Sequence, residues 1–164
     1  MRDVTSTPVL ERLAYCSRAT QALDQEELTE LLDRARAHNH VNDVTGILVY
    51  CHDHFLQILE GAPEAVAKTL ERIRRDQRHT DLQVLQIEHT TARRFDQWHM
   101  GYCPTACRPP LQQRLKALFA SPPNSRDIAQ VEPMLRTFYD AAQLDGRLQG
   151  DNWFRPLLPP RQAS

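Results

Sequence analysis

The sequence lacks an excess of either charge, and it lacks any long apolar run. Its 20 basic and 21 acidic residues give 164 residues a formal net charge of −1, so no overall field favours nucleic acid or an anionic membrane. No apolar run approaches the roughly 20 residues that cross a bilayer, and residues 1–7 contain no apolar core of a signal peptide. We therefore expect a cytoplasmic protein that binds neither nucleic acid nor membrane.

The chain also lacks the cysteine and histidine spacings of redox and zinc motifs. Its cysteines are Cys16, Cys51, Cys103 and Cys107. The last two are separated by three residues, whereas a redox Cys-x-x-Cys motif has two. The histidine pairs His38/His40 and His52/His54 form no standard zinc-finger pattern with them. We predict free thiols in a reducing compartment and no bound metal.

Apolar periodicity and turn residues predict the element order β-α-β-β-α-β-β. The expected strands are residues 10–16, 45–51, 55–60, 82–88 and 95–102, and the expected helices are residues 24–39 and 61–76. Two β-α-β units of this kind build a ferredoxin-like sheet with both helices on one face. The predicted fold class is therefore α+β, with a ferredoxin-like βαββαββ sheet.

The composition changes at Pro104, which predicts a division into three parts. We expect an N-terminal extension at 1–9, a ligand-binding domain at 10–103, and a helical extension with a tail at 104–164. Pro133 must either kink the second of the two expected helices or mark its start. Apolar stripes on these helices are suited to cover the free face of the sheet. The stripes are Leu111, Leu115 and Leu118, then Ile128, Val131, Leu135 and Phe138.

Three polar side chains interrupt the predicted apolar surfaces between the helices and the sheet. Gln57 shares a strand face with Phe55 and Leu59, Tyr15 is on the first strand, and Asn39 continues the apolar stripe of the first helix. Each has an alternative structural explanation: a locally bonded glutamine, or an asparagine that ends a helix. Together, a tyrosine and two amides suit a flat heteroaromatic ligand with carbonyls and ring nitrogens along one edge.

Further residues complete this predicted pocket. Leu31, Leu32, Val66 and Ile73 could sandwich the faces of a flat ring. Asp76 and Arg78 at its far end could meet ribityl hydroxyls and phosphate, because guanidinium matches phosphate geometry.

Several motifs, in order along the chain, resemble those of a BLUF domain, a blue-light sensor that uses FAD. The resemblance covers roughly residues 10–102, and the order of its motifs makes it far more specific than a single match. The motifs are Leu13-Ala-Tyr-Cys-Ser-Arg-Ala19, Ala37-His-Asn39 with Val44-Thr-Gly46, Phe55-Leu-Gln-Ile-Leu-Glu-Gly61, Asp76-Gln-Arg-His79 and Arg94-Phe-Asp-Gln-Trp-His-Met-Gly101.

The resemblance implies a bound FAD between the two helices and a role for each matching residue. Tyr15 resembles the light-driven electron and proton donor, and Gln57 the amide that bridges this tyrosine and the flavin. Asn39 resembles the residue that bonds the pyrimidine end of the ring. Trp98 and Met100 match the fifth-strand pair that responds to the glutamine. His38, Asp76, Arg78 and His79 match positions around the cofactor.

The implied output is a signal and not a reaction product, so we predict a sensor and not an enzyme. Light rearranges the Gln57 amide, and the change passes through the fifth strand and the C-terminal helices. We expect a homo-oligomer or a downstream protein partner to receive it.

Two other ferredoxin-like proteins remain as alternatives. A nucleic-acid-binding module would use the arginines of the second helix, but its third strand presents stacking aromatics, and Phe55-Leu-Gln-Ile-Leu59 has no such motif. Those arginines, Arg72 among them, are more typical of a solvated face. An acylphosphatase-like enzyme needs a phosphate-cradling loop after the first strand, and Ser17-Arg-Ala-Thr20 contains no glycine.

Overall fold

The structure is a computed structural model of the chain, and it describes residues 8–96, 99–103, 108–120 and 125–144. The elements in chain order are β1 (Leu10–Ala19), α1 (Gln25–Asn42), β2 (Thr45–Cys51), β3 (His54–Gly61), α2 (Pro63–Arg74), β4 (His79–Thr90), β5 (Gly101–Tyr102), α3 (Pro109–Ala120) and α4 (Ser125–Leu144).

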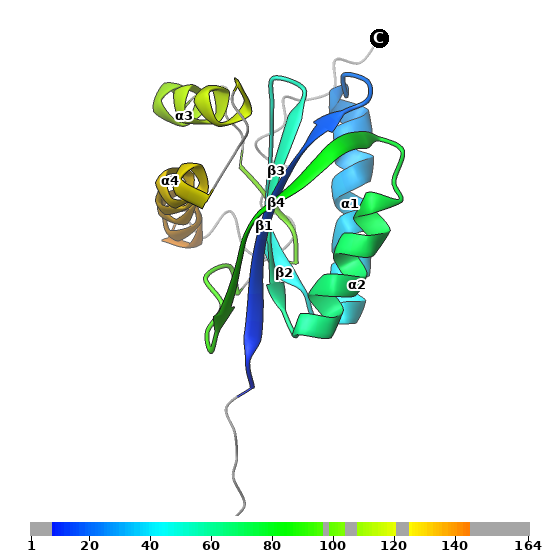
Figure 1. Cartoon of the computed structure of the whole chain (residues 1–164), viewed down its shortest axis with the longest axis vertical. Coiled ribbons are helices and arrows are strands. Elements are labelled where there is room, and N and C mark those ends of the chain that lie inside the picture. Colours follow the sequence, from blue (N-terminus) through cyan, green and yellow to red (C-terminus); the bar gives the residue numbers. More distant parts are fainter. Residues whose placement is uncertain (1–7, 97–98, 104–107, 121–124, 145–164) are drawn as a thin grey trace, which may run out of the picture.

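The five strands form one sheet in the order β4-β1-β3-β2-β5. All neighbours are antiparallel except β2 and β5, which run parallel. Helices α1 and α2 cover one face of the sheet, and α3 and α4 cover the other (Figure 1). The prediction of a ferredoxin-like α+β fold with C-terminal helices on the second face is confirmed.

Because both faces of the sheet are covered, β3 is buried along almost its whole length. This explains why its sequence is nearly continuously apolar, as in other strands covered on both sides. The stripes predicted for α3 and α4 are buried as expected: Leu111, Leu115, Leu118, Ile128, Val131, Leu135 and Phe138. Pro133 lies inside α4 and is exposed, so it does not mark a helix start.

Local sequence explains the ends of α1 and the turn between β2 and β3. Asp24 caps α1 and forms a capping box with Glu27. The helix ends at Asp43, whose φ of 53° is left-handed, and not at Asn39. His52 and Asp53 have φ of 51° and 60°, as a two-residue turn between twisted strands requires.

Several predicted strand bounds are wrong, most of all those of the fifth strand. Of the described residues in 95–102, only Gly101 and Tyr102 form a strand. Side chains hold the preceding backbone in place of a strand ladder: Glu60 accepts the Phe95 N–H at 2.7 Å, and residues of α1 bond the carbonyls of residues 99 and 100. Strands β1 and β4 are longer than predicted because they pair with each other as far as Ala19 and His79.

Trp98, Cys107 and the segments 1–7 and 145–164 lie outside the described residues. The cysteines that the structure describes, Cys16, Cys51 and Cys103, are buried free thiols, and burial raises the pKa of Cys16 to about 11. No helix in the described segments is long and apolar enough to cross a membrane.

Candidate functional site

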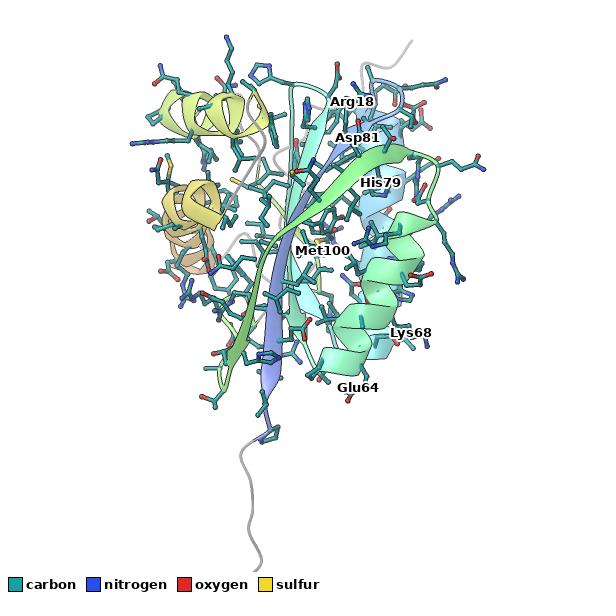
Figure 2. All side chains as sticks on the ribbon, viewed as in Figure 1. Arg18, Glu64, Lys68, His79, Asp81 and Met100 are labelled. Carbon is teal, nitrogen blue, oxygen red and sulfur yellow. The ribbon has the colours of Figure 1, made fainter. Side chains whose placement is uncertain are left out.

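A cavity lies between the sheet and the two helices that cover its first face. Its volume is about 420 Å³, counting the part that is open to solvent. Figure 2 shows His79 on this side of the sheet, and Met100 in the interior of the molecule. The cavity is lined by Tyr15, Leu31, Arg34, Ala35, Leu48, Phe55, Gln57, Arg72, Ile73, Asp76, Arg78 and His79.

Tyr15 and Gln57 form a buried polar chain on the sheet wall of this cavity. They are direct cross-strand partners on β1 and β3, and the Tyr15 hydroxyl donates to Gln57 Oε1. Gln57 Nε2 lies 3.1 Å from Met100 Sδ. Burial raises the pKa of Tyr15 above the range of an ordinary phenol, so Tyr15 is a neutral donor. The Gln57 amide is thus held at both ends.

Asn39 is fully buried on α1 but is not among the residues that line the cavity. Its Nδ2 donates to the His99 carbonyl at 2.7 Å. Its Oδ1 has no hydrogen-bond partner within the described residues. Leaving a buried acceptor unpaired costs about 1–3 kcal/mol, so Asn39 Oδ1 is available to accept from a group outside the described residues.

Arg72 is a cavity residue that the sequence analysis assigned wrongly to a solvated face. It is half-buried, and its Nε has no hydrogen-bond partner in the described part of the chain. Burial lowers the pKa of its guanidinium, and the charge of Asp76 works against that shift. The helical spacing contains a signal: Arg72 follows the fully buried Thr69 by three residues, which places it on the inner side of α2.

Asp76 and Arg78 form an ion pair with each other at the mouth of the cavity. Arg78 Nη2 lies 2.5 Å from Asp76 Oδ2, and Arg78 Nε lies 3.0 Å from both carboxylate oxygens. Burial acts to raise the pKa of Asp76, but the hydrogen bonds from Arg78 outweigh it and lower that pKa. Because Arg78 holds Asp76, the nearby Arg72 and Arg34 leave the cavity mouth with an excess of positive charge.

The predicted apolar lining is only partly correct. Leu31 and Ile73 line the cavity, whereas Leu32 and Val66 are fully buried in the core and do not. Leu48 and Phe55 take their place, because alternate residues of β2 and β3 face the helices. Their contribution was not predicted.

Of the two histidines predicted near the ligand, only His79 lines the cavity. His38 is half-buried, and its Nε2 lies 3.3 Å from Asn42 Nδ2. The Nδ1 of His79 lies 3.1 Å from Ser17 Oγ, and its ring stands edge-on to Phe55 at 5.3 Å. Burial lowers the pKa of His79, and the nearby Asp76 acts against the shift.

The lowered pKa of His79 predicts a loss of stability in acid. A histidine whose folded-state pKa lies below the ordinary 6.5 contributes stability that is complete above pH 6.5 and lost as pH falls through the lowered value. We expect the melting temperature of the wild type to fall between pH 7 and 5, and that of His79→Gln to fall by a few degrees less.

A family model described as sensors of blue-light using FAD (BLUF) matches residues 10–101. The photoactivated adenylate cyclase subunit beta-like protein FB of Euglena gracilis is 31% identical over 123 residues, which are 73% of this chain and 14% of that protein. The blue light- and temperature-regulated antirepressor BluF of Escherichia coli strain K12 is 34% identical over 87 residues, 53% of this chain and 22% of that protein. The chain therefore corresponds to a minor part of each relative.

Solved structures with the same fold point to the same family. The dark-state structure of BlrB, a BLUF protein, is 28% identical with a TM-score of 0.70, and the match covers 80% of this chain and 98% of that one. A bacterial light-regulated adenylyl cyclase is 30% identical with a TM-score of 0.61, over 78% of this chain and 36% of that one. Since the family model spans more than half of the chain, this protein belongs to the BLUF family of blue-light sensors.

Proposed function

We propose that the chain binds FAD non-covalently in the cavity and responds to blue light through Tyr15 and Gln57. The observation that carries this proposal is the buried chain that runs from the Tyr15 hydroxyl at the cavity wall through the Gln57 amide to Met100. Tyr15 is neutral and its hydroxyl is already hydrogen-bonded to an amide oxygen. It is therefore suited to lose an electron and a proton together.

The unpaired polar atoms match the edge of a flavin ring. A flavin's pyrimidine end offers an N–H donor beside carbonyl acceptors, and Asn39 Oδ1 and Arg72 Nε supply one acceptor and one donor. Leu31 and Ile73 supply apolar contact for the ring faces. The residues present therefore fit a flavin.

A second hollow supports a dinucleotide as the natural ligand. It has a volume of about 950 Å³ with its solvent-open part, and it shares Arg34, Asp76 and Arg78 with the first cavity. A ligand whose ring fills the first cavity would pass its phosphates by these arginines and place its adenosine in the second. A BlrP1 structure is described as holding FMN, so the comparison between FMN and FAD affinity is the direct test of this step.

A bound flavin would supply the absorption of blue light and a strong one-electron oxidant beside Tyr15. Tyr15 gives up an electron, and its hydroxyl proton leaves along the hydrogen bond to Gln57 Oε1. The electron and the proton would then both return to Tyr15, and the Gln57 amide would be left rearranged, with its hydrogen bonds to Tyr15 and to Met100 exchanged for others. No substrate is turned over, so the chain acts as a switch.

Polar contacts on one side of α4 support an output route through the C-terminal helices. Glu132 bonds Arg94, Arg136 Nη1 donates to the Arg94 carbonyl at 2.7 Å, and the Tyr139 hydroxyl donates to Asp96 at 2.6 Å. These three α4 residues, spaced by four and three, hold the segment between β4 and β5. We propose that this segment transmits the change at Met100 to α4, and that a protein partner or a second copy of the chain reads α4.

The proposed function is tested by absorption spectra of the purified protein before and after blue light. A yellow protein with a reversible red shift is the expected result. A colourless protein that cannot be reconstituted with FAD would contradict the proposal, and binding of single-stranded RNA by that protein would favour the nucleic-acid alternative.

Asn39→Ala is expected to weaken flavin binding by about 1–3 kcal/mol, the cost of an unpaired buried polar partner. Fluorescence titration of apoprotein with FAD measures the change. Asn42→Ala is a matched control one turn later on α1, where the side chain bonds His38 and no other described residue. Equal affinity of the Asn39 and Asn42 variants would show that Asn39 does not contact the flavin.

Glu132→Gln is expected to reduce the effect of light on α4. In the wild type, illumination should change amide exchange in residues 125–144, because α4 is bonded to the segment before β5. Glu132→Gln should at least halve the difference between dark and lit amide exchange in residues 125–144. The corresponding difference at Gly101 and Tyr102 should not change. Arg114→Gln removes a bond between α3 and Gln130 and is the control. Equal exchange in dark and light in the wild type would leave α4 as a static cover.

A further inference from the structure

Two carbonyl groups just before β5 are held by side chains of α1. Arg36 Nε donates to the Met100 carbonyl at 3.0 Å, and Asn39 Nδ2 donates to the His99 carbonyl at 2.7 Å. Arg36 and Asn39 are three residues apart and therefore share one face of the helix. The last turns of α1 thus fix the backbone on which the Met100 side chain is mounted.

The sheet contributes only a short ladder after Met100, and the ring of His99 before it lies 3.2 Å from the Val44 carbonyl. The strand that follows it has two residues, paired only with Ile47 and Leu48 of β2, and the next bond is Cys103 N–H to the Leu48 carbonyl at 3.0 Å. Met100 is nevertheless fully buried, with its sulfur 3.1 Å from Gln57 Nε2. Side-chain contacts from α1 therefore do much of what a longer strand would do.

The bond to the Met100 carbonyl requires Arg36 to bury its charge. It is 7% exposed, and its ion pair with Asp33 is long, at 3.5 Å, with the Asp33 side chain half exposed. A guanidinium removed from water needs strong hydrogen bonds in return, and bonds from a charged donor are stronger than neutral ones. The bond from Arg36 Nε to the Met100 carbonyl, at 3.0 Å, is shorter than this ion pair.

We propose that Arg36 is a positioning residue that holds Met100 against Gln57, and so sets how long the light-induced arrangement of Gln57 persists. This inference rests on the proposed function. The contact with Met100 favours the Gln57 orientation that is described above, in which Oε1 faces Tyr15. When Arg36 no longer holds Met100, that orientation loses one of its two partners, and the amide returns to it more slowly after light.

The test compares Arg36→Met with Asp33→Asn. Methionine has similar reach but no donor, and the Asp33 side chain that loses its partner is half exposed and stays in water. We expect flavin occupancy to stay the same and dark-state amide exchange at Gly101–Cys103 to become about tenfold faster, consistent with loss of one charged hydrogen bond. After a blue pulse, return to the dark spectrum should be about threefold slower or more, as part of that free energy enters the barrier.

Asp33→Asn removes the weak ion pair but leaves the bond to Met100, so its exchange and return rate should match the wild type. Arg36→Lys keeps the charge without the guanidinium geometry. If the direction of the hydrogen bond matters, the exchange rate and the return rate of Arg36→Lys should lie nearer to those of Arg36→Met than to those of the wild type. The proposal would be overturned if Arg36→Met and Arg36→Lys both fold and both show wild-type amide exchange at Gly101–Cys103. The same result requires that they return to the dark spectrum at the wild-type rate or faster.

The two proposals fail in different ways. A wild type that binds no flavin, or shows no light response, refutes the proposed function. The dark-state exchange measurement needs no light, so it still decides whether Arg36 holds the segment that contains Met100. A light-responsive wild type with unchanged Arg36 variants refutes only the role of Arg36.

Discussion

Tyr15→Phe is expected to give a protein that keeps its flavin and its yellow colour but forms no red-shifted product. Phenylalanine fills the same space in β1 and retains the packing of a side chain that is 1% exposed. It has no hydroxyl to donate to Gln57 Oε1, so no proton can follow the electron along that bond. The loss should be complete because the hydroxyl takes part in the step and does not merely tune it.

Illuminated-minus-dark absorption spectra and flavin fluorescence measure this effect. Fluorescence should rise in Tyr15→Phe, because electron transfer from the tyrosine no longer competes with emission. Tyr102→Phe is the control: Tyr102 is on β5, where burial raises its pKa to about 12, and it does not line the cavity. Gln57→Leu should lose the product as well, since leucine has no amide to rearrange. A normal light-induced shift in Tyr15→Phe would refute the assignment.

Glu60→Ala should destabilise the fold more than any cavity substitution. Glu60 is 0% exposed, and its carboxylate accepts bonds from Arg12 Nε at 3.0 Å and from the backbone N–H groups of Arg94 and Phe95 at 2.9 and 2.7 Å. Removing one partner of a buried ion pair costs about 3–5 kcal/mol. Arg12 would lose its fully buried partner and keep the partly exposed Glu88 and the more distant Glu132. Two backbone donors lose their acceptor as well.

Urea unfolding followed by far-UV circular dichroism measures the loss. Glu88→Ala is the matched control, since Glu88 also bonds Arg12, at 2.9 Å, but its side chain is 37% exposed. Partly exposed pairs contribute about 0–1 kcal/mol, so Glu88→Ala should cost far less. Glu60→Gln keeps an acceptor for the backbone and should fall between the two. Equal losses of stability in Glu60→Ala and Glu88→Ala would show that the buried Glu60 carboxylate contributes no more to the stability of the fold than the partly exposed Glu88.

Glu60 also explains why the fifth strand was predicted at the wrong length. The apolar and aromatic residues after Phe95 are typical of a strand, and the sequence pattern contains no sign that a carboxylate 35 residues earlier takes the Phe95 N–H. Strand propensity describes how a segment fits a pleated surface. It cannot describe a backbone whose hydrogen bonds are satisfied by side chains from β3 and α1.

The pairing of Tyr15 with Gln57 could be predicted as far as the shared face, because strand alternation is a local property. Arg36 was not recognised in this way, and neither was Arg72, although its spacing from the buried Thr69 contains a signal. Both are basic residues on helices, where a solvated position is the ordinary expectation. Arg36 is buried beside Met100 and Arg72 is half-buried beside the cavity, and those contacts join segments far apart in the chain.

The sequence by itself determined the order of the elements, the apolar stripes of the four helices, and the motifs that resemble the BLUF family. These depend on residues close together in the chain, whose spacing reports burial. Only the tertiary structure decided which partner each buried polar atom finds: the His99 carbonyl for Asn39 Nδ2, the Met100 carbonyl for Arg36, and none within the described residues for Asn39 Oδ1 and Arg72 Nε. Spacing predicts that a polar group is buried, but its hydrogen bond depends on the position and direction of an atom on another segment.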